Sequence, residues 1–368
     1  MHIKCSKKDL MNSLSMCSMP AISNINNNPI INNLLFLFDN EKLNLISTNL
    51  EITIKTDIKA EIIEKGNITI PAKKLIDITK EADENIDIIS NENKVNIKFG
   101  NSRFSILGMS SDDYPSLPNL ELKEDDSDII FLEKNIFIQM IKKTIYAVST
   151  DRDRFVLNGI LLKIENKTLT LVSTDGKRLC VVSSELEKET TNFIEIIIPT
   201  KTINELLKIL DKINSNILYI KTNDNQVLFK LGDTIFISKV VDGKFPNYKQ
   251  VIPNNLTKKV ILSRLEFLSA TKRASIINLD SIKYLFNENK LIVSAISPGV
   301  GEIEDELKID YTQENFEIAY NPRYIMDFLE SIDDEKISLE LDTSFNPCII
   351  KPLKDDNNYI CVIMPMRI

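Results

Sequence analysis

The chain has a single histidine, His2, among its 368 residues. A Ser-His-Asp triad, a histidine-based zinc site and histidine acid–base catalysis all require this residue type, so its scarcity argues against most hydrolases. The nine glycines form no Gly-rich phosphate loop. From these absences we expect no catalytic residue, no metal site and no cofactor.

The cysteines show no pairing pattern, since their number is odd and no two have C-x-x-C spacing. A disulfide framework and a thiolate metal site are therefore unexpected, and the thiols are typical of reduced, mostly buried residues in a cytosolic protein. They are Cys5, Cys17, Cys180, Cys348 and Cys361.

Long apolar runs are missing as well, and no run approaches the roughly 18 residues that span a bilayer. Residues 1–20 are interrupted by the charges of Lys4, Lys7, Lys8 and Asp9, so they lack the apolar stretch of a signal peptide. We therefore expect a cytoplasmic protein with no membrane partner.

The composition is that of a folded, acidic protein. With 43% apolar and 27% charged residues, the chain is long enough for two or three domains, each with its own core. Lys and Arg number 45 and Asp and Glu 53, which gives a net charge of −8. Taken as a bulk property, this charge argues against binding of nucleic acid.

Three faint copies of one unit follow one another along the chain. Residues 71–78, 199–206 and 321–328 share one pattern: a base two positions after the first residue and an acid six positions after it. Proline at or beside the start of each copy indicates a strand running into a helix. A second series, at 43–49, 169–175 and 291–297, has nearly the same spacing.

The repeats predict three domains, over residues 1–124, 125–253 and 254–368. The first boundary falls in the acidic segment 121–128, and the second in the Pro-Asn-Asn turn at 253–255. Near the start of each domain an amphipathic helix is expected, over 7–19, 133–149 and 263–276. The pattern of the remainder predicts short strands, so each domain has two helices and about eight strands, an α+β class repeated three times.

The charge is unevenly distributed over these elements. The six predicted helices carry about +6, which leaves about −14 for the rest of a chain whose total is −8. A scattered Lys/Arg lining suits contact with phosphates and carries no base readout. Such a helical face could hold DNA loosely.

Four motifs together resemble one family, the bacterial DNA polymerase III beta subunit, or beta sliding clamp. They are Phe-Val-Leu-Asn-Gly at 155–159, Ser-Thr-Asp-Gly-Lys-Arg-Leu at 173–179, Gly-Lys-Phe-Pro-Asn-Tyr at 243–248 and Met-Pro-Met-Arg-Ile at 364–368. The resemblance covers the whole chain. It implies the DNA clamp fold, with two helices and two small antiparallel sheets in each domain.

The resemblance also implies a function without catalysis. Two chains would associate head to tail into a ring of six domains, with helices lining the hole and double-stranded DNA threaded through it regardless of sequence. Such a processivity factor tethers the replicative DNA polymerase, and its partners include the clamp loader and other proteins with clamp-binding peptides. Weak inner contacts would favour sliding.

The resemblance assigns two sets of binding residues. Between Ile25 and Asn28, where the family often has a DNA-contacting arginine, this chain has none; Lys177 and Gln250 replace a frequent His and Arg of the peptide pocket. The implied DNA-binding residues are Lys73, Lys142, Lys143, Arg152, Arg154, Phe155, Lys201, Lys208, Arg264, Lys272 and Arg323. The implied peptide pocket comprises Leu157, Thr174, Gly176, Lys177, Arg178, Leu179, Pro246, Val251, Val362, Met364, Pro365, Met366 and Arg367.

For ring closure, the resemblance pairs the first domain of one chain with the third domain of the other. Ile276 and Ile277 would form the apolar contact, with Phe104 opposite. The charged residues of this interface would be Glu302, Glu304, Asp305 and Glu306 on one side and Lys74 and Arg103 on the other, an arrangement that favours correct register.

Two alternatives from other classes are open. An enzyme could use Asp175 and Lys177 in the Thr-Asp-Gly-Lys turn, although Asp-Gly is a common turn pair and no second carboxylate is fixed nearby. A triplicated scaffold could bind proteins without encircling DNA. Retention on circular but not on linear DNA would distinguish a ring from such a scaffold.

Overall fold

The computed structural model describes residues 1–22, 28–39, 41–118, 122, 129–190, 193–223, 225–354 and 358–367. The chain forms two compact units, Met1–Asn135 with Lys201–Val240, and Ile136–Thr200 with Val241–Ile368. The predicted linker at 121–128 lies outside the described residues, except for residue 122. No helix of the described ranges is long and apolar enough to cross a membrane.

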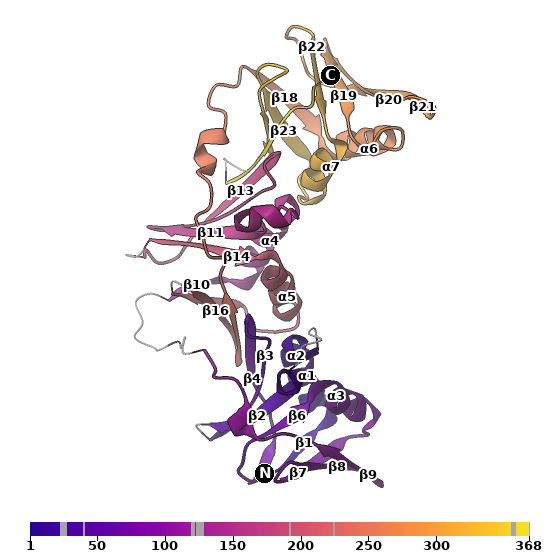
Figure 1. Cartoon of the computed structure of the whole chain (residues 1–368). Helices are drawn as coiled ribbons and strands as arrows, with labels where there is room; N and C mark the ends of the chain where they lie inside the picture. The colour runs from indigo at the N-terminus through magenta and orange to yellow at the C-terminus, as the bar shows by residue number, and fades with distance from the viewer. Residues whose placement is uncertain are drawn as a thin grey trace. The chain divides into compact units, whose positions relative to one another are not determined.

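One order of elements occurs three times: a strand, a helix, a run of strands, a second helix and three final strands (Figure 1). The first copy comprises β1 (His2–Ser6), α1 (Lys7–Cys17), α2 (Met19–Ile22), β2 (Asn33–Asp39), β3 (Lys42–Thr48), β4 (Ile52–Asp57), β5 (Glu61–Glu64), β6 (Ile68–Pro71), α3 (Ala72–Glu81), β7 (Asn85–Asn91), β8 (Lys94–Phe99) and β9 (Ser102–Leu107).

The other two copies have the same order with eight strands each, which confirms the predicted triplication and α+β class. The second contains β10 (Ile130–Glu133), α4 (Lys134–Lys142), β11 (Gly159–Glu165), β12 (Thr168–Thr174), β13 (Arg178–Glu185), β14 (Ile194–Pro199), α5 (Thr200–Leu210), β15 (Ile217–Thr222), β16 (Gln226–Leu231) and β17 (Thr234–Lys239). The third contains β18 (Lys258–Ser263), α6 (Arg264–Ser275), β19 (Ile282–Asn287), β20 (Lys290–Ser297), β21 (Gly301–Lys308), β22 (Phe316–Tyr320), α7 (Pro322–Glu330), β23 (Lys336–Leu341), β24 (Cys348–Pro352) and β25 (Tyr359–Ile363).

The small sheets of neighbouring copies merge across the copy boundaries. In the first unit β4 pairs with β17, and this pairing produces the eight-stranded sheet β10-β15-β16-β17-β4-β3-β2-β6. In the second unit β13 pairs with β25, and the sheet runs β14-β11-β12-β13-β25-β24-β23-β18. Both junction pairings are antiparallel, so backbone hydrogen bonds join each copy to the next.

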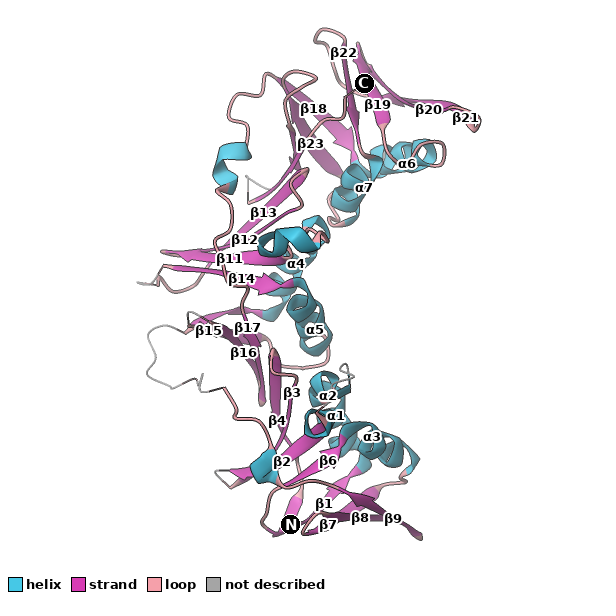
Figure 2. Cartoon of the chain, viewed as in Figure 1, coloured by secondary structure: helices cyan, strands magenta, loops and turns pink. Residues whose placement is uncertain are grey.

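The helices pack against the sheets through their apolar faces. In the first unit α1 and α3 lie beside each other, and in the second α6 and α7 do (Figure 2). Ser6 caps α1 by accepting a hydrogen bond from the backbone N–H of Asp9. Asn321 caps α7 in the same way, and Pro322 stands at its first turn as the sequence pattern predicts.

One helix ends earlier than predicted. The sequence indicated a helix over 133–149, but α4 ends at Lys142 and a 3-10 turn at Ile145–Ala147 follows. Thr144 has φ of −123°, outside the helical range, and its backbone N–H donates to the carbonyl of Ile141, three residues back, at 3.0 Å. The predicted apolar face survives in part, because Met140 and Ile141 are buried.

All five cysteines are free and buried, and they generate a prediction for alkaline pH. Burial raises the pKa of the Cys5, Cys17 and Cys348 thiols to about 12. A raised pKa in the folded state contributes stability that is present below about pH 9 and is lost as the pH rises toward 12. The free energy of unfolding, measured by urea titration, should therefore fall over this range. A thiol reagent at pH 8 should modify the native protein far more slowly than the unfolded one; equal rates would contradict the prediction.

Candidate functional site

A cavity of about 250 Å³ opens on the second unit, and we refer to it as the slot. It lies where the start of β11, the turn between β12 and β13, the segment after Gly243 and the end of β25 meet. Most of its lining surface is apolar. Its lining residues are Leu157, Thr174, Gly176, Lys177, Arg178, Leu179, Phe245, Pro246, Asn247, Tyr248, Val251, Val362 and Met364.

The turn between β12 and β13 has its shape fixed by local hydrogen bonds. Asp175 Oδ1 accepts from the backbone N–H groups of Lys177 (2.9 Å) and Arg178 (3.0 Å). The hydroxyl of Thr174 donates to the Arg178 carbonyl at 2.6 Å and accepts from the Gly176 N–H. Gly176 has φ of +87°, a conformation that side chains disfavour. The Thr-Asp-Gly pattern therefore builds a rigid wall for the slot.

The slot is a surface extension of a hydrophobic core. Leu157, Leu179 and Val362 are buried in one cluster with Phe245. Val251 and Met364 are 53% and 44% exposed, so they present apolar surface to solvent at the mouth of the slot. An apolar cavity with a few fixed polar groups is typical of a site for an extended peptide.

The structure brings together ten of the thirteen residues that the resemblance assigned to a peptide pocket. Pro365, Met366 and Arg367 follow Met364 in sequence but do not line this cavity; the Met366 N–H instead donates to the Ala319 carbonyl at 2.8 Å. Sequence reasoning missed Phe245, Asn247 and Tyr248. Their signal was present, since all three belong to the Gly-Lys-Phe-Pro-Asn-Tyr motif.

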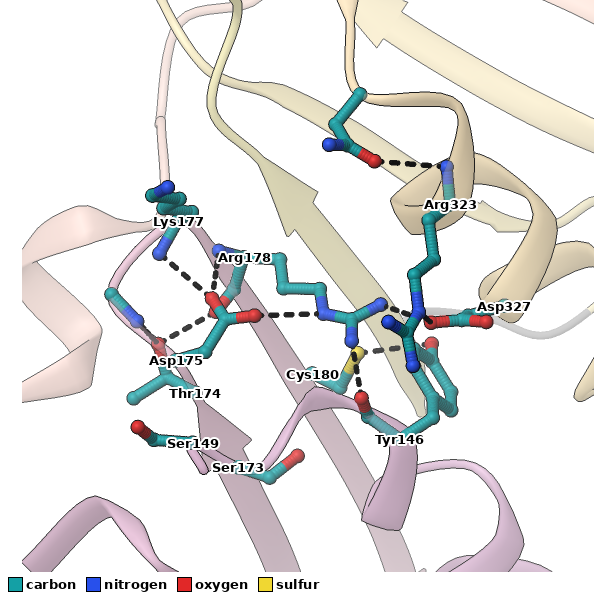
Figure 3. Close-up of polar contacts among 12 residues, drawn as sticks. Tyr146, Ser149, Ser173, Thr174, Asp175, Lys177, Arg178, Cys180, Arg323 and Asp327 are labelled. Atoms are coloured by element: carbon teal, nitrogen blue, oxygen red, sulfur yellow. Dashed lines mark hydrogen bonds and ion pairs between the residues drawn. The ribbon is translucent and has the colours of Figure 1, made fainter. Parts of the chain in front are cut away.

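Arg178 connects the slot with a second cavity of about 510 Å³ that is mostly polar. Its side chain is only 6% exposed, and Figure 3 shows its guanidinium between Asp175 and Asp327. Nε donates to Asp175 Oδ2 at 3.1 Å, Nη1 to Asp327 Oδ2 at 2.6 Å, and Nη2 to the Tyr146 carbonyl. Burial alone would lower the pKa of Arg178, but the hydrogen bond and charge of Asp327, together with the charge of Asp175, raise it overall.

The residues assigned to DNA divide into two kinds. Most are exposed, and several have an acidic neighbour: Lys272 with Glu330 at 2.6 Å, and Lys208 with Glu205 at 3.1 Å. Lys201 lies 3.6 Å from Glu51, Arg154 lies 3.6 Å from Asp151, and Arg323 lies 3.8 Å from Asp327. The remaining exposed members are Lys73, Lys142, Arg152 and Phe155.

Two members of that set are engaged within the protein. The Arg264 guanidinium donates to the carbonyls of Asp334 at 2.8 Å and Leu329 at 3.1 Å, so it fixes the chain after α7. The Lys143 ammonium lies 5.1 Å from the centre of the Tyr359 ring. Of the segment in which the family's arginine is missing, only Asn28 is among the described residues.

The residues assigned to ring closure lie on the strands β9 and β21, on α3, which contains Lys74, and at the end of α6. Ile276, at the end of α6, is 78% exposed, while Ile277 is half-buried. Phe104 on β9 stacks on Phe99, and the exposed apolar side chain of that strand is Leu107, at 75%, which sequence reasoning missed.

The charged members of the same set differ in their partners. Glu302 and Glu304 of β21 are exposed, as are Lys74 and Arg103. Asp305 accepts from Arg273 Nε at 2.6 Å within its own copy, and Glu306 pairs with Lys290 at 3.0 Å. Asp305 therefore already has a cationic partner in the single chain.

Comparison with known proteins places these features in a family. Models of the DNA polymerase III beta subunit match as its N-terminal domain over residues 1–118, its central domain over 131–247 and its C-terminal domain over 249–367. The beta sliding clamps of Haemophilus influenzae and Pseudomonas putida are 30% and 31% identical over the full length of both chains. A crystal structure of the Pseudomonas aeruginosa sliding clamp bound to griselimycin has a TM-score of 0.92, at 28% identity and full coverage of both chains.

The chain belongs to the DNA polymerase III beta subunit family. It has the clamp fold of three repeated domains, and it is a DNA sliding clamp, a non-catalytic processivity factor. The enzyme alternative is therefore wrong. In the turn between β12 and β13, both Asp175 oxygens accept hydrogen bonds, one from backbone N–H groups and one from Arg178, so this carboxylate has a structural role.

The loop that carries Phe245 into the slot of this clamp depends on a glycine. Gly243 has φ of +127°, and a Cβ there would lie 2.8 Å from Val156 Cγ1. Gly299 has φ of +78°, and a Cβ at that position would meet nothing within 4 Å. Both alanine substitutions should carry backbone strain of about 1–3 kcal/mol, but Gly243→Ala should cost about 1 kcal/mol more through crowding. Urea titration of both variants checks this; equal losses would contradict it.

Proposed function

We propose that two copies of this clamp close head to tail into a ring of six domains around double-stranded DNA, without sequence preference. The domains would be residues 1–124, 125–253 and 254–368; the first boundary lies between the family matches at 1–118 and 131–247, and the second lies a few residues after the start of the match at 249–367. We also propose that the ring acts in the cytoplasm. The proposal rests on the way in which successive copies pair their edge strands within the chain.

Each junction within the chain uses equivalent strands. β4 closes the run β2-β3-β4 and pairs with β17, the last strand of the next copy; β13 closes the run β11-β12-β13 and pairs with β25, again the last strand. By the same rule β21 of the third copy would pair with β9 of a first copy. Both are edge strands with one partner each among the described residues. An unpaired edge favours a further strand.

The side chains near these edges support pairing between two chains. Leu107 lies at the end of β9, and Ile276, Ile296 and Val300 lie near β21; each is at least 67% exposed. Glu302 and Glu304 would face Lys74 and Arg103, opposite charges that favour the correct register. Because the contact joins different surfaces, it generates a closed ring only at a suitable angle, and two chains of three domains satisfy this in the family.

The bases on and beside the helices would face the DNA. The weak contacts with DNA would come from the helix bases and from the loop before Leu157. The helix bases are Lys73, Lys142, Lys143, Lys201, Lys208, Lys272 and Arg323, and the loop residues are Arg152, Arg154 and Phe155. Arg264 would contribute indirectly, since its guanidinium holds two backbone carbonyls. These contacts are weak because salt screens them, so the clamp can slide. Its retention on DNA then depends on the closed ring and not on affinity.

The slot would bind short peptides of the replicative DNA polymerase, the clamp loader and other partners. Val251 and Met364 offer an adaptable apolar surface, and the fixed turn at Gly176 offers backbone groups to an extended chain. Pro365, Met366 and Arg367 would contact the peptide where it leaves the cavity. A sliding clamp of Pseudomonas aeruginosa binds griselimycin, and we propose that this compound also binds the present clamp.

A loading assay tests the ring. With clamp loader and ATP, the clamp should remain on nicked circular plasmid and be lost when the plasmid is linearised. Ile276→Asp should give monomers in sedimentation and abolish retention, because it buries a charge in the apolar contact. Ile63→Asp, on β5 at 48% exposure, is the matched control. Equal loss from circles and linear DNA would favour the protein-binding scaffold.

A truncation in the slot tests the peptide site. Met364→Ala removes about 1–2 kcal/mol of apolar contact and should weaken polymerase peptide binding roughly tenfold, as measured by fluorescence anisotropy. The dimer should persist, because Met364 is remote from β9 and β21 in sequence and pairing. Phe345→Ala is the control, since Phe345 is 82% exposed and does not line the slot. Unchanged peptide affinity in Met364→Ala would remove the slot from the proposal.

A further inference from the structure

We propose that Arg178 is a positioning residue that fastens the slot to the C-terminal domain, instead of contacting the peptide with its side chain. This inference rests on the proposed peptide function of the slot. Arg178 lies in the slot motif, but its guanidinium is buried among Asp175, Asp327 and the rings of Tyr146 and Tyr324. The direction in which the Arg178 side chain points, and not its position in the motif, therefore defines its role.

Strand alternation explains that direction. Arg178, Leu179 and Cys180 are consecutive on β13, so the first and third point to the face opposite the second. Leu179 belongs to the apolar cluster beneath the slot. Arg178 and Cys180 both contact Tyr146 on the other face: Nη2 of the arginine reaches its carbonyl, and the cysteine thiol lies 3.0 Å from its hydroxyl (Figure 3).

A continuous set of bonds leads from α7 to the slot. Asp327 on α7 accepts from the guanidinium, which also donates to Asp175 Oδ2. The other oxygen of Asp175 accepts from the N–H groups of Lys177 and Arg178, the bonds that shape the turn. The Lys177 carbonyl accepts from the Met364 N–H at 2.9 Å. The C-terminal domain therefore holds the turn from both sides.

Comparison of the three copies shows that this arginine is specific to one junction. The spacing of the repeats aligns Ile52, Arg178 and Val300. Ile52 is buried at the β4–β17 junction, opposite Ser238, and Val300 is 67% exposed beside β21. A buried ion pair is rarely more stabilising than a well-packed apolar residue. Since the apolar Ile52 is enough to hold the β4–β17 junction together, the charged Arg178 at the slot junction has a role beyond holding the two copies together.

The consequence is a coupling between peptide binding and docking of the C-terminal domain. We infer that the turn has its binding shape only while Asp327 holds Arg178. Loosening this contact then lowers the affinity for the peptide, and a bound peptide strengthens the contact by an equal factor. Specific peptides would thereby stabilise the junction between the central and C-terminal domains.

The test uses Asp327→Asn, because Asp327 does not line the slot. The probe is a fluorescein-labelled polymerase peptide, chosen from a tiling set because Met364→Ala weakens its binding. Asp327→Asn should lower the affinity for this peptide about tenfold, while Asp327→Glu, which keeps the charge, should retain most of the affinity. The matched control is Glu330→Gln on the same helix, which removes the ion pair of Glu330 with Lys272. It should bind like the unaltered clamp.

Two further measurements separate positioning from general destabilisation. Amide hydrogen exchange should rise at residues 174–179 in Asp327→Asn and stay unchanged in the β20–β21 hairpin. In an Arg178→Met background, Asp327→Asn should have no additional effect on peptide affinity, because the contact is already absent. Unchanged peptide affinity in Asp327→Asn, or a full effect in the Arg178→Met background, would overturn the inference. Failure of the unaltered clamp to bind any polymerase peptide would instead overturn the proposed function of the slot, and this inference with it.

Discussion

Antiparallel pairing of strand edges between successive copies is the constraint on which the molecule depends. Each copy can join its neighbours through two of its strand edges, one at the third strand of its run and one at its last strand, and each junction pairs one edge of each kind, as β4–β17 and β13–β25 do. Three copies in a row necessarily leave one edge of each kind, β21 and β9. Exposed edges are liabilities that proteins cover or pair, so the proposed ring resolves a problem that the triplication creates.

The same junctions decide where a binding site can form. At β13–β25 the turn after β12 meets the chain end that follows β25, and the slot occupies that meeting place. The equivalent position of the first copy has Leu50 where the slot has Gly176, and both have positive φ. The leucine is 51% exposed, whereas a Cβ at Gly176 would lie 2.7 Å from Arg154 Nη1, so a side chain at this position of the second copy would have to displace Arg154. Among the described residues, the two junctions of one repeated architecture therefore differ in a few side chains, and the slot lies at β13–β25.

The sequence predicted the fold well because the repeat markers are local. Proline before a helix, Asp-Gly in a turn and alternating strands each specify their own element, and their common spacing reveals the triplication. The merged sheets were not visible, since nothing in Ile52–Asp57 or Thr234–Lys239 marks these strands as partners. The end of α4 was predicted too late, because the apolar pattern continues past Thr144 while the backbone there leaves the helical conformation.

Site residues were predicted by motif, and motifs specify positions but not side-chain directions. Arg264 and Arg178 were both assigned to ligand contact, yet both guanidinium groups donate to acceptors of the protein itself. Alternation along β13 already places Arg178 on the face opposite Leu179, so one of the two must be turned away from the slot. A buried guanidinium requires bonded acceptors, and Asp175 and Asp327 supply them on that face. Asp327 is the acid six positions into the third repeat, so this part of the repeat pattern has a structural role.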